Sequence, residues 1–548
     1  MEHETIQTDV LIIGGGGAAG RAAYEAKRME PQVEVTVATE GIWGSGGSTV
    51  WVASETLGIN APLNASDDGD SPDVYLEDIL KTGLGLADES LASIIAHEAS
   101  DRILELIEMG VTFDGVGEKP RQRKLSGCTK ARSLAEGGQT GVSIVSVLKK
   151  ASLEKGVKVL EGIRLLDLIC AEGEVWGARG FRQGKQIDIL AKAVILANGG
   201  AGAIFPHNIN HPSLKGDGFA MAFRAGAALT NLEFFQIGPG VVFPKMHFII
   251  HSHMWNFCPR LRNVLGEEFL SNYLPKGISK DEVLSLKSMS FPFSVRTNAR
   301  YLDISIFKEI CSGRGTENGG VIFDVNHVPD SELKNKAPIT YETFLKNGVN
   351  LCVDSIEIAP LVQNFNGGVK IDENAATTVP GLFAIGEVSG GVHGADRPGG
   401  NNLTDCQVFG YRGGRAAAGL AIERSGKPKE IFREKELILQ EKTDMLASVK
   451  TDMLASVKTA MDKSLMIVRH KEGLLALLEE IEGCRQKVSQ LDVTTDNFLL
   501  VAEMFARSAL YREESRGIHY REDFPNRDPA FDKPSLIRKG EGGEMVVF

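Results

Sequence analysis

The chain has 548 residues, of which 43% are hydrophobic and 24% are charged, and its formal net charge is −12. This composition is typical of a globular protein long enough for several domains, each with its own core. The acidic balance argues against a general nucleic-acid binder, which needs a basic face. We therefore expect no nucleic-acid partner.

The sequence also bears on membranes, compartment and metals. No stretch approaches the roughly 18 apolar residues of a membrane-spanning helix, so we expect no transmembrane segment of its own. The acidic start MEHETIQTD lacks the basic region of a signal peptide, and the seven scattered cysteines suit reduced thiols. We expect a cytoplasmic protein, with docking on a membrane through a partner as an open alternative. Because no CxxC pair exists, we expect neither an iron–sulfur cluster nor another metal site within the chain.

The first elements in chain order open a doubly wound sheet. Residues 8–16 form an apolar run ending in glycines, 17–29 predict a small-residue helix, and 33–38 predict a second strand. Farther along, 186–200 predict another strand, and 216–235 predict a helix that leads into NLEFFQ.

The pattern changes from residue 240 onward. Aromatic, His and Met residues increase and the strand–helix alternation blurs, which predicts an inserted domain, until strand patterns return at 367–387. We interpret the chain as α/β, with a doubly wound, Rossmann-like dinucleotide-binding domain that is split by a capping domain and followed by a helical C-terminal domain. The predicted boundaries are 1–239 and 353–424 for the split domain, 240–352 for the capping domain and 425–548 for the helical domain.

The helical part contains a tandem repeat. KTDMLASV occupies residues 442–449 and again 450–457. A shift of eight residues rotates a helix face by about 80°, so the two copies cannot present one identical face. We interpret the repeat as a local duplication within a surface helix and assign it no function.

A dinucleotide fingerprint follows the first strand. Glycines there permit a tight turn and let backbone N–H groups approach a pyrophosphate, and the helix N-terminus adds about half a positive charge. Glu40 lies near the end of the second strand, where an acid can bind a ribose hydroxyl. A glycine-rich turn without a ligand is the alternative. Two registers satisfy the fingerprint: Gly14-x-Gly16-x-x-Ala19 and Gly15-x-Gly17-x-x-Gly20.

A second acid and a second helix start lie close to residue 400. The segment VPGLFAIGE places Glu387 at the end of an apolar strand, where a carboxylate suits a ribityl or ribose hydroxyl. Asn401 and Asn402 precede a helix expected to begin near Leu403. A helix N-terminus aimed at a flavin ring would stabilise negative charge on the reduced isoalloxazine. This half of the sequence therefore favours FAD over NAD.

Four motifs, in order, resemble those of the succinate dehydrogenase, fumarate reductase and L-aspartate oxidase flavoproteins. They are DVLIIGGGGAAGRAA, GDGFAMAFRAGA with NLEFFQ, VPGLFAIGEVSGGVHGADRPGGNNL, and REESRGIHYREDFPNRD. The resemblance covers nearly the whole chain and implies an FAD-dependent oxidoreductase with a mobile capping domain. It also implies FAD contacts from Asp217, Glu387 and the turn at 401–403. Ser48 stands where succinate dehydrogenases and many fumarate reductases carry a flavin-linking histidine, so we expect non-covalent FAD.

The same resemblance implies a substrate site beside HGADR. His393 and Arg397 match the family's histidine and its carboxylate-binding arginine in HGANR, and charge-assisted bonds suit a carboxylate. Two further substrate histidines are missing, because the family's His–Pro pair is Gly238–Pro239 here and its His–Tyr pair is Gln363–Asn364. Each lost hydrogen bond to a charged group costs about 1.5–3 kcal/mol. We therefore expect a substrate other than succinate or fumarate.

Replacement donors are expected in the inserted domain. His251 and His253 stand where the family usually has a Thr–Glu pair, and they share one face if the segment is a strand. Their spacing also fits a metal site, but no third ligand is apparent, and plain core or surface histidines are a further alternative. The family's proton-shuttling arginine has Arg300 as its best counterpart, with Arg296 as the alternative.

Three functions remain in competition. The first is hydride transfer between flavin and a small carboxylate or acyl substrate, with electrons passing through an iron–sulfur partner subunit. The second is an electron-transfer flavoprotein subunit of a larger iron–sulfur complex, with a degenerate dicarboxylate site. The third is an L-aspartate oxidase-like enzyme, which fits non-covalent FAD but is weakened by the same missing histidines. The retained HGADR and the His-rich insert favour the first.

Overall fold

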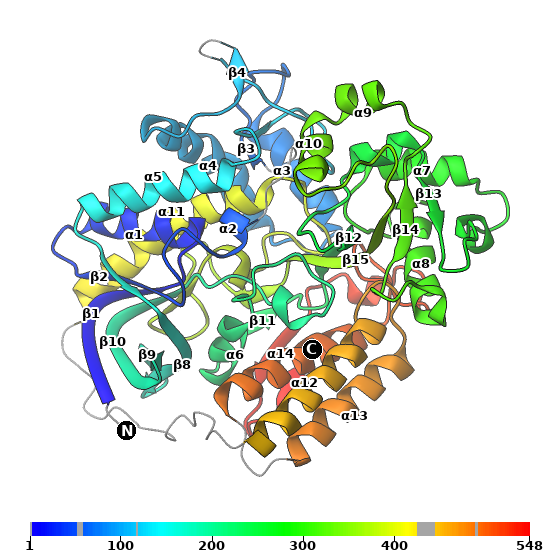
Figure 1. Ribbon diagram of the computed structural model, residues 1–548. Coiled ribbons are helices and arrows are strands. Elements are labelled where there is room, and N and C mark those ends of the chain that lie inside the picture. The colour runs from blue at the N-terminus through cyan, green and yellow to red at the C-terminus, as the bar shows by residue number, and fades with distance from the viewer. Residues whose placement is uncertain (1–2, 52–57, 117–118, 425–443, 488–491) are drawn as a thin grey trace.

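The computed structural model describes residues 3–51, 58–116, 119–424, 444–487 and 492–548. A seven-stranded sheet forms the centre of the nucleotide-binding part (Figure 1). Its order is β7-β2-β1-β10-β9-β8, and β17 pairs with the C-terminal end of β10. Neighbours among β7, β2, β1, β10 and β17 are parallel, whereas β9 and β8 extend the sheet in antiparallel fashion. The strands are β1 (His3–Ile13), β2 (Val35–Thr39), β7 (Lys158–Glu161), β8 (Ile163–Ala171), β9 (Glu174–Arg182), β10 (Lys185–Leu196) and β17 (Leu382–Ala384).

Three helices, α1 (Gly17–Met29), α5 (Thr140–Glu154) and α11 (Asn401–Glu423), lie together on one side of this sheet (Figure 1). Small residues bring α1 and α11 into backbone contact. A Cβ on Gly414 of α11 would lie 2.4 Å from the carbonyl oxygen of Ala22, and one on Gly410 would lie 3.0 Å from that of Ala18. Helices α3 (Pro72–Gly83) and α4 (Glu89–Glu108) pack beyond α11.

The inserted part contains a second, four-stranded antiparallel sheet in the order β12-β15-β14-β13. The chain enters through β12 and returns through β15, and the two strands pair along their length. A separate cluster of buried apolar side chains, from Val241 to Ile358, fills this part. Its elements are β12 (Phe235–Phe243), β13 (Arg260–Arg262), α7 (Lys280–Met289), α8 (Arg300–Glu309), β14 (Val321–Asp324), α9 (Asp330–Lys336), α10 (Pro338–Lys346) and β15 (Ile356–Phe365).

The C-terminal part is mainly helical and ends on the nucleotide-binding part. Helix α13 (Lys471–Lys487) packs between α12 (Asp444–Ser464) and α14 (Val493–Tyr511). A five-stranded sheet then joins the chain end to earlier segments in the order β18-β16-β11-β19-β20. These strands are β11 (Leu229–Thr230), β16 (Gly368–Lys370), β18 (Ser389–Gly390), β19 (Leu536–Lys539) and β20 (Met545–Val547).

The fold class predicted from the sequence is confirmed, and one predicted element is wrong in length. Helix α1 spans the predicted residues, but the helix expected over 216–235 is only α6 (Asp217–Arg224). Gly226 follows with φ of +92°, the left-handed conformation that ends helices. Within the described ranges, no helix is long and apolar enough to cross a membrane. The first copy of KTDMLASV begins at 442, outside the described residues, as does the predicted start of the helical domain at 425, and the domain boundaries stay predictions.

The contact between α1 and α11 predicts opposite effects for two glycines of the same helix. Gly414→Ala should lower stability by about 1–3 kcal/mol, because the new methyl group collides with the backbone of α1. Gly419→Ala is the matched control, because its Cβ meets no described atom within 4 Å, and it should stabilise α11 by about 0.5–1 kcal/mol. Thermal unfolding of both variants checks this, and equal midpoints would contradict it.

Candidate active site

A cavity of ≈ 470 Å³ lies where the C-terminal ends of β1, β2, β10 and β17 meet the N-termini of α1 and α11. Crevices at this edge of a parallel sheet are where doubly wound folds bind nucleotides. The main lining segments come from distant parts of the chain: 13–18, 38–42, 45–49, 163–165, 197–199, 211–217, 363–365, 385–387 and 402–406 without 404.

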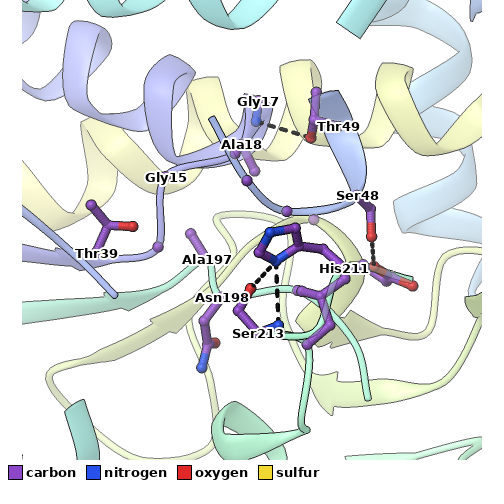
Figure 2. Close-up of a pocket in the computed structure, with 18 of the residues that line it drawn as sticks. Gly15, Gly17, Ala18, Thr39, Ser48, Thr49, Ala197, Asn198, His211 and Ser213 are labelled. Atoms are coloured by element: carbon purple, nitrogen blue, oxygen red, sulfur yellow. Dashed lines mark hydrogen bonds between the residues drawn. The ribbon is translucent and has the colours of Figure 1, made fainter. Parts of the chain in front are cut away.

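The glycine-rich turn forms one end of the cavity. Gly14 has φ of +125°, and a Cβ there would lie 2.3 Å from the carbonyl oxygen of Ala197, the residue after β10, so no side chain fits. Gly15, Gly16 and Gly17 face the cavity. The N–H of Gly17 donates to the Thr49 hydroxyl at 3.2 Å (Figure 2). This end of α1 therefore offers backbone donors and the positive end of the helix dipole to an anion.

The other two fingerprint residues lie behind the wall of the cavity. Ala19 is fully buried and, like Gly20, does not line the cavity. A Cβ on Gly20 would lie 3.1 Å from Cβ of Leu148, so Gly20 permits close packing of α1 on α5. The structure thus assigns both residues to packing.

Two predicted acids stand along the cavity wall. Glu40 follows β2; its side chain is 41% exposed and its Oε1 lies 3.7 Å from Nζ of Lys215. Asp217 begins α6 and accepts hydrogen bonds from Arg164 at 2.9 Å and from Asn497 of α14 at 2.8 Å. Glu40 has only long contacts, to Lys215 and at 4.0 Å to Arg164, and keeps an exposed carboxylate for a ribose hydroxyl, whereas Asp217 is held by short hydrogen bonds.

Ser48 and Glu387 meet across the cavity. Ser48 Oγ donates to Glu387 at 3.2 Å (Figure 2), and the N–H groups of Gly200 and Phe365 donate to the same carboxylate at 3.2 and 3.3 Å. Burial by the surrounding chain raises the pKa of Glu387 to about 6, although its side chain stays partly accessible from the cavity. Glu387 is therefore fixed in place at the centre of the site.

Helix α11 begins at Asn401, and the residues of its first turn either line the cavity or anchor the helix from behind. Asn402 and Leu403 line the cavity, and Asn402 donates to Asn364 at 2.6 Å. Asn401 is fully buried and accepts from Tyr75 at 2.8 Å and from Asn60 at 2.7 Å. Its side chain thus holds the start of α11 in place from behind rather than lining the cavity.

The HGADR segment places a cation and an imidazole in the interior. Arg397 is 8% exposed and donates to Gln236 at 2.5 Å and to the carbonyl of Pro398 at 2.9 Å. Its Nε has no hydrogen-bond partner among the described residues. His393 lines the cavity with Nε2 3.4 Å from Asp405, and burial lowers the pKa of His393. Arg397 keeps N–H donors for an anion, and His393 is poised as a neutral ring.

The inserted part brings Arg296, rather than Arg300, to HGADR. Arg296 Nη2 lies 2.7 Å from the buried carboxylate of Asp396. Arg300 donates to the carbonyl of Val295 and to the hydroxyl of Tyr301, and it stacks on the Tyr301 ring. The geometry therefore favours the arginine that sequence comparison ranked second.

Neither His251 nor His253 lies in a strand, because His253 belongs to the 3-10 helix Ser252–Phe257. His251 precedes the 3-10 helix Ser252–Phe257, yet its ring stacks on that of His253 with 6.3 Å between centroids. Burial lowers the pKa of His251 to about 3, which keeps the ring neutral. His251 also contacts Phe291 at 5.6 Å. The two rings thus lie together, but the start of the 3-10 helix places them there rather than a strand.

Other side chains occupy the places of the two missing histidines. A Cβ on Gly238 would lie 2.4 Å from the ring of Phe291, so this aromatic ring fills the space a side chain would need. Gln363 and Asn364 line the cavity, and Oε1 of Gln363 is buried without a partner in the described part of the chain. An unpaired buried acceptor suits contact with a ligand.

Thr49 and His211 are among the cavity residues that sequence analysis missed. Thr49 meets the start of α1, as described above. Figure 2 shows the His211 ring inside the cavity, where Nδ1 contacts the Ser213 hydroxyl at 2.7 Å. Trp51 packs edge-on against His211 at 4.8 Å. The His211–Pro212 pair shortly before GDGFAMAF was the one sequence feature that could have indicated a site residue here. It was overlooked because it lies in a loop.

FAD fits this cavity. The glycine turn leaves a cradle where added Cβ atoms on Gly15 and Gly16 would lie only 3.1 Å from Trp43 and 3.3 Å from Thr49. Two helix N-termini suit a pyrophosphate and a reduced flavin ring, and Glu40 and Glu387 offer carboxylates for hydroxyl groups along the way. Fold and cavity together define an FAD-binding protein.

Comparison with known proteins agrees. The family described as "FAD binding domain" matches residues 9–403, and the one described as "Fumarate reductase flavoprotein C-term" matches 455–546. The chain is 35% identical to the A subunit of Fumarate reductase (CoM/CoB) from Methanothermobacter marburgensis, with 98% of each chain covered. It is 28% identical to L-aspartate oxidase of Synechocystis, with 97% of each covered. The solved structure of Mycobacterium smegmatis Sdh1 in complex with UQ1 has a TM-score of 0.83 and 29% identity, covering 100% of this chain and 94% of that chain.

The chain therefore belongs to the succinate dehydrogenase/fumarate reductase flavoprotein family. It is an FAD-dependent oxidoreductase of the fumarate reductase/succinate dehydrogenase type.

The raised pKa of Glu387 predicts a pH-dependent stability for the FAD-free protein. Folding raises this pKa from 4.5 to about 6, so the folded state holds the proton more tightly. The contribution is fully present below pH 4.5 and is lost as pH rises through about 6. Glu387→Gln removes this dependence. Its thermal midpoint should rise relative to wild type between about pH 5 and 7, whereas Glu541→Gln at an exposed position should track wild type. A constant difference for Glu387→Gln would contradict the prediction.

Proposed function

We propose that this protein transfers a hydride between FAD and a carbon–carbon bond next to a carboxylate, on a substrate other than succinate or fumarate. The observation that carries this proposal is Arg397, a buried guanidinium that Gln236 and Pro398 hold in place while its Nε stays unpartnered among the described residues. An arginine offers several N–H donors in a rigid fork that matches a carboxylate. This cation is held in place just before the N-terminus of α11 and keeps N–H donors available. It is therefore suited to orient such a substrate.

The chemistry balances without any further reagent in the site. Bound FAD in its reduced form supplies the hydride, and one proton completes the conversion of a C=C bond into a C–C single bond; the reverse direction oxidises the saturated acid. Arg296, near Asp396, is the proposed proton-moving residue, with Arg300 and the histidines His251 and His253 as alternatives. Arg397 and His393 would hold the carboxylate end.

We propose that electrons reach or leave the flavin through another protein. Among the described residues, no group of His, Cys, Asp or Glu could hold a metal ion. We propose that the partner is an iron–sulfur subunit, in a cytoplasmic complex. The names of two relatives support a multi-subunit assembly, because each describes its protein as one subunit of a larger enzyme. One is the Methanothermobacter protein at 35% identity, and the other, at 28%, is the "8-methylmenaquinol:fumarate reductase flavoprotein subunit" of Wolinella succinogenes.

Fumarate is the competing substrate, because a relative at 35% identity carries it in its name. L-aspartate competes for the same reason at 28% identity. Steady-state oxidation of a reduced viologen by a panel of enoates, with fumarate included, separates these cases. Activity with an enoate other than fumarate supports the proposal. Flavin that cycles only with a protein partner would favour the electron-transfer role instead.

The flavin is expected to be non-covalent, because Ser48 and Thr49 face the cavity where a linking histidine would stand. After precipitation with trichloroacetic acid, the yellow colour and flavin fluorescence should stay in the supernatant. Of the two histidines that line the cavity, His211 and His393, His211 packs against Trp51, which follows Ser48 and Thr49, so flavin found in the pellet would overturn the prediction and make His211 the first residue to test. Loss of the pellet flavin in His211→Ala would then identify the link.

Arg397 is expected to bind the substrate and not to contribute to FAD binding. Arg397→Gln should lower kcat/KM by about 10²-fold or more, through lost charge-assisted hydrogen bonds. The flavin content should stay unchanged, because Arg397 does not line the nucleotide cavity. The exposed Arg538→Gln is the control. An unchanged kcat/KM in Arg397→Gln would show that Arg397 does not bind the substrate.

A further inference from the structure

The charges around Arg397 are unevenly matched. Asp396 is fully buried beside it and accepts hydrogen bonds from the backbone N–H of Arg397 at 2.8 Å and from Gln236 at 3.4 Å. The second cation, Arg296, lies 2.7 Å from Asp396. Asp396 and Arg296 therefore balance each other, whereas no described carboxylate forms an ion pair within 4 Å of Arg397, although Glu387 and Asp405 lie near enough to act on its charge.

The neighbouring wall is neutral and aromatic. Gln236 and Gly238 lie two residues apart on β12, where Phe291 fills the space above Gly238. Ser126 joins this wall to the arginine loop, because its hydroxyl accepts from the N–H of Phe291 at 3.3 Å and its carbonyl accepts from the N–H of Gly399 at 2.8 Å. The rings of His251 and Phe291 are in contact, and the His251 ring is neutral.

We propose, on the basis of the hydride-transfer function above, that the substrate carries one carboxylate only, and that Asp396 is the residue that rejects a second. Arg397 binds the single carboxylate, and the uncharged remainder of the molecule faces Phe291 and His251. The chemical class is a 2-enoate monocarboxylate or its saturated counterpart. Because Asp396 neutralises Arg296, a second carboxylate would meet a pair without net charge or a wall without charge, and an uncompensated anion is costly in a buried site.

A binding experiment tests this without turnover. The oxidised holoprotein is titrated with crotonate, cinnamate, fumarate and succinate, and the flavin absorbance change reports each dissociation constant. We expect one or both of the monocarboxylates crotonate and cinnamate to bind about tenfold or more tightly than fumarate and succinate. Tighter binding of either dicarboxylate overturns the inference.

Two variants shift the selectivity in opposite directions. Asp396→Asn keeps the side-chain shape but leaves the charge of Arg296 uncompensated, so the preference for crotonate over fumarate should fall about tenfold. Arg296→Gln, at a side chain that is 29% exposed, leaves Asp396 uncompensated and should raise that preference in this binding measurement. The control Asp73→Asn, at a side chain 87% exposed, should leave it unchanged. An unchanged preference in Asp396→Asn, or a fall in Arg296→Gln, overturns the role of Asp396.

The outcomes separate this inference from the function on which it rests. Monocarboxylates could bind preferentially while the enzyme reduces no enoate in the viologen assay. That result would refute the hydride-transfer function but support the preference for a single carboxylate. Fumarate that is bound and reduced best would support hydride transfer to a carboxylate and refute the single-carboxylate class. Absence of binding by all four acids would refute both.

Discussion

The site depends on the direct contact between α1 and α11. Gly410 and Gly414 let the second helix approach the carbonyl oxygens of Ala18 and Ala22, at distances where no Cβ could stand. Gln407 adds a hydrogen bond to the carbonyl of Gly17 at 3.5 Å. Because the helices touch through backbone, their N-termini open onto one cavity although they are nearly four hundred residues apart in the chain. A nucleotide cradle and a flavin-ring donor are thus brought together by residues that contact no ligand.

The C-terminal part supports the same site through a buried network of charges. Arg512 pairs with Glu233, and Arg469 donates to the carbonyl of Glu233 at 2.7 Å, all with buried side chains. Glu233 lies two residues before β12, so the network fixes the start of that strand. Gln236, at the beginning of β12, then holds Arg397. Removal of one partner from such a buried pair is costly, which explains why a distant C-terminal motif accompanies an N-terminal binding fold.

Much of this could be predicted from the sequence, because short-range patterns determine local elements. The glycine turn and α1 are set by an apolar strand followed by small residues, and the structure places them where the pattern predicts. A motif, however, does not show which side of a turn faces the cavity. Ala19, Gly20 and Asn401 belong to the motifs yet lie behind the wall. The choice between Arg296 and Arg300 depends on how the inserted part folds back onto HGADR, a contact with no local signal.

The departures from the family pattern fit together, and this bears on whether the substrate site has decayed. A decayed pocket would leave voids or unpaired charges, each of which destabilises a folded protein. Here Phe291 fills the space above Gly238, and Arg296 lies beside the acid at 396 where the resembling motif has asparagine. Several buried polar atoms without a hydrogen-bond partner among the described residues gather at this site, namely Arg397 Nε, Gln363 Oε1 and the ring nitrogens of His393, although Nε2 of His393 lies 3.4 Å from Asp405. Buried donors kept unpaired in an otherwise repacked site are costly unless a ligand meets them. This pattern supports the proposal of a site adapted to a different ligand, and it favours a working enzyme over a protein that only passes electrons.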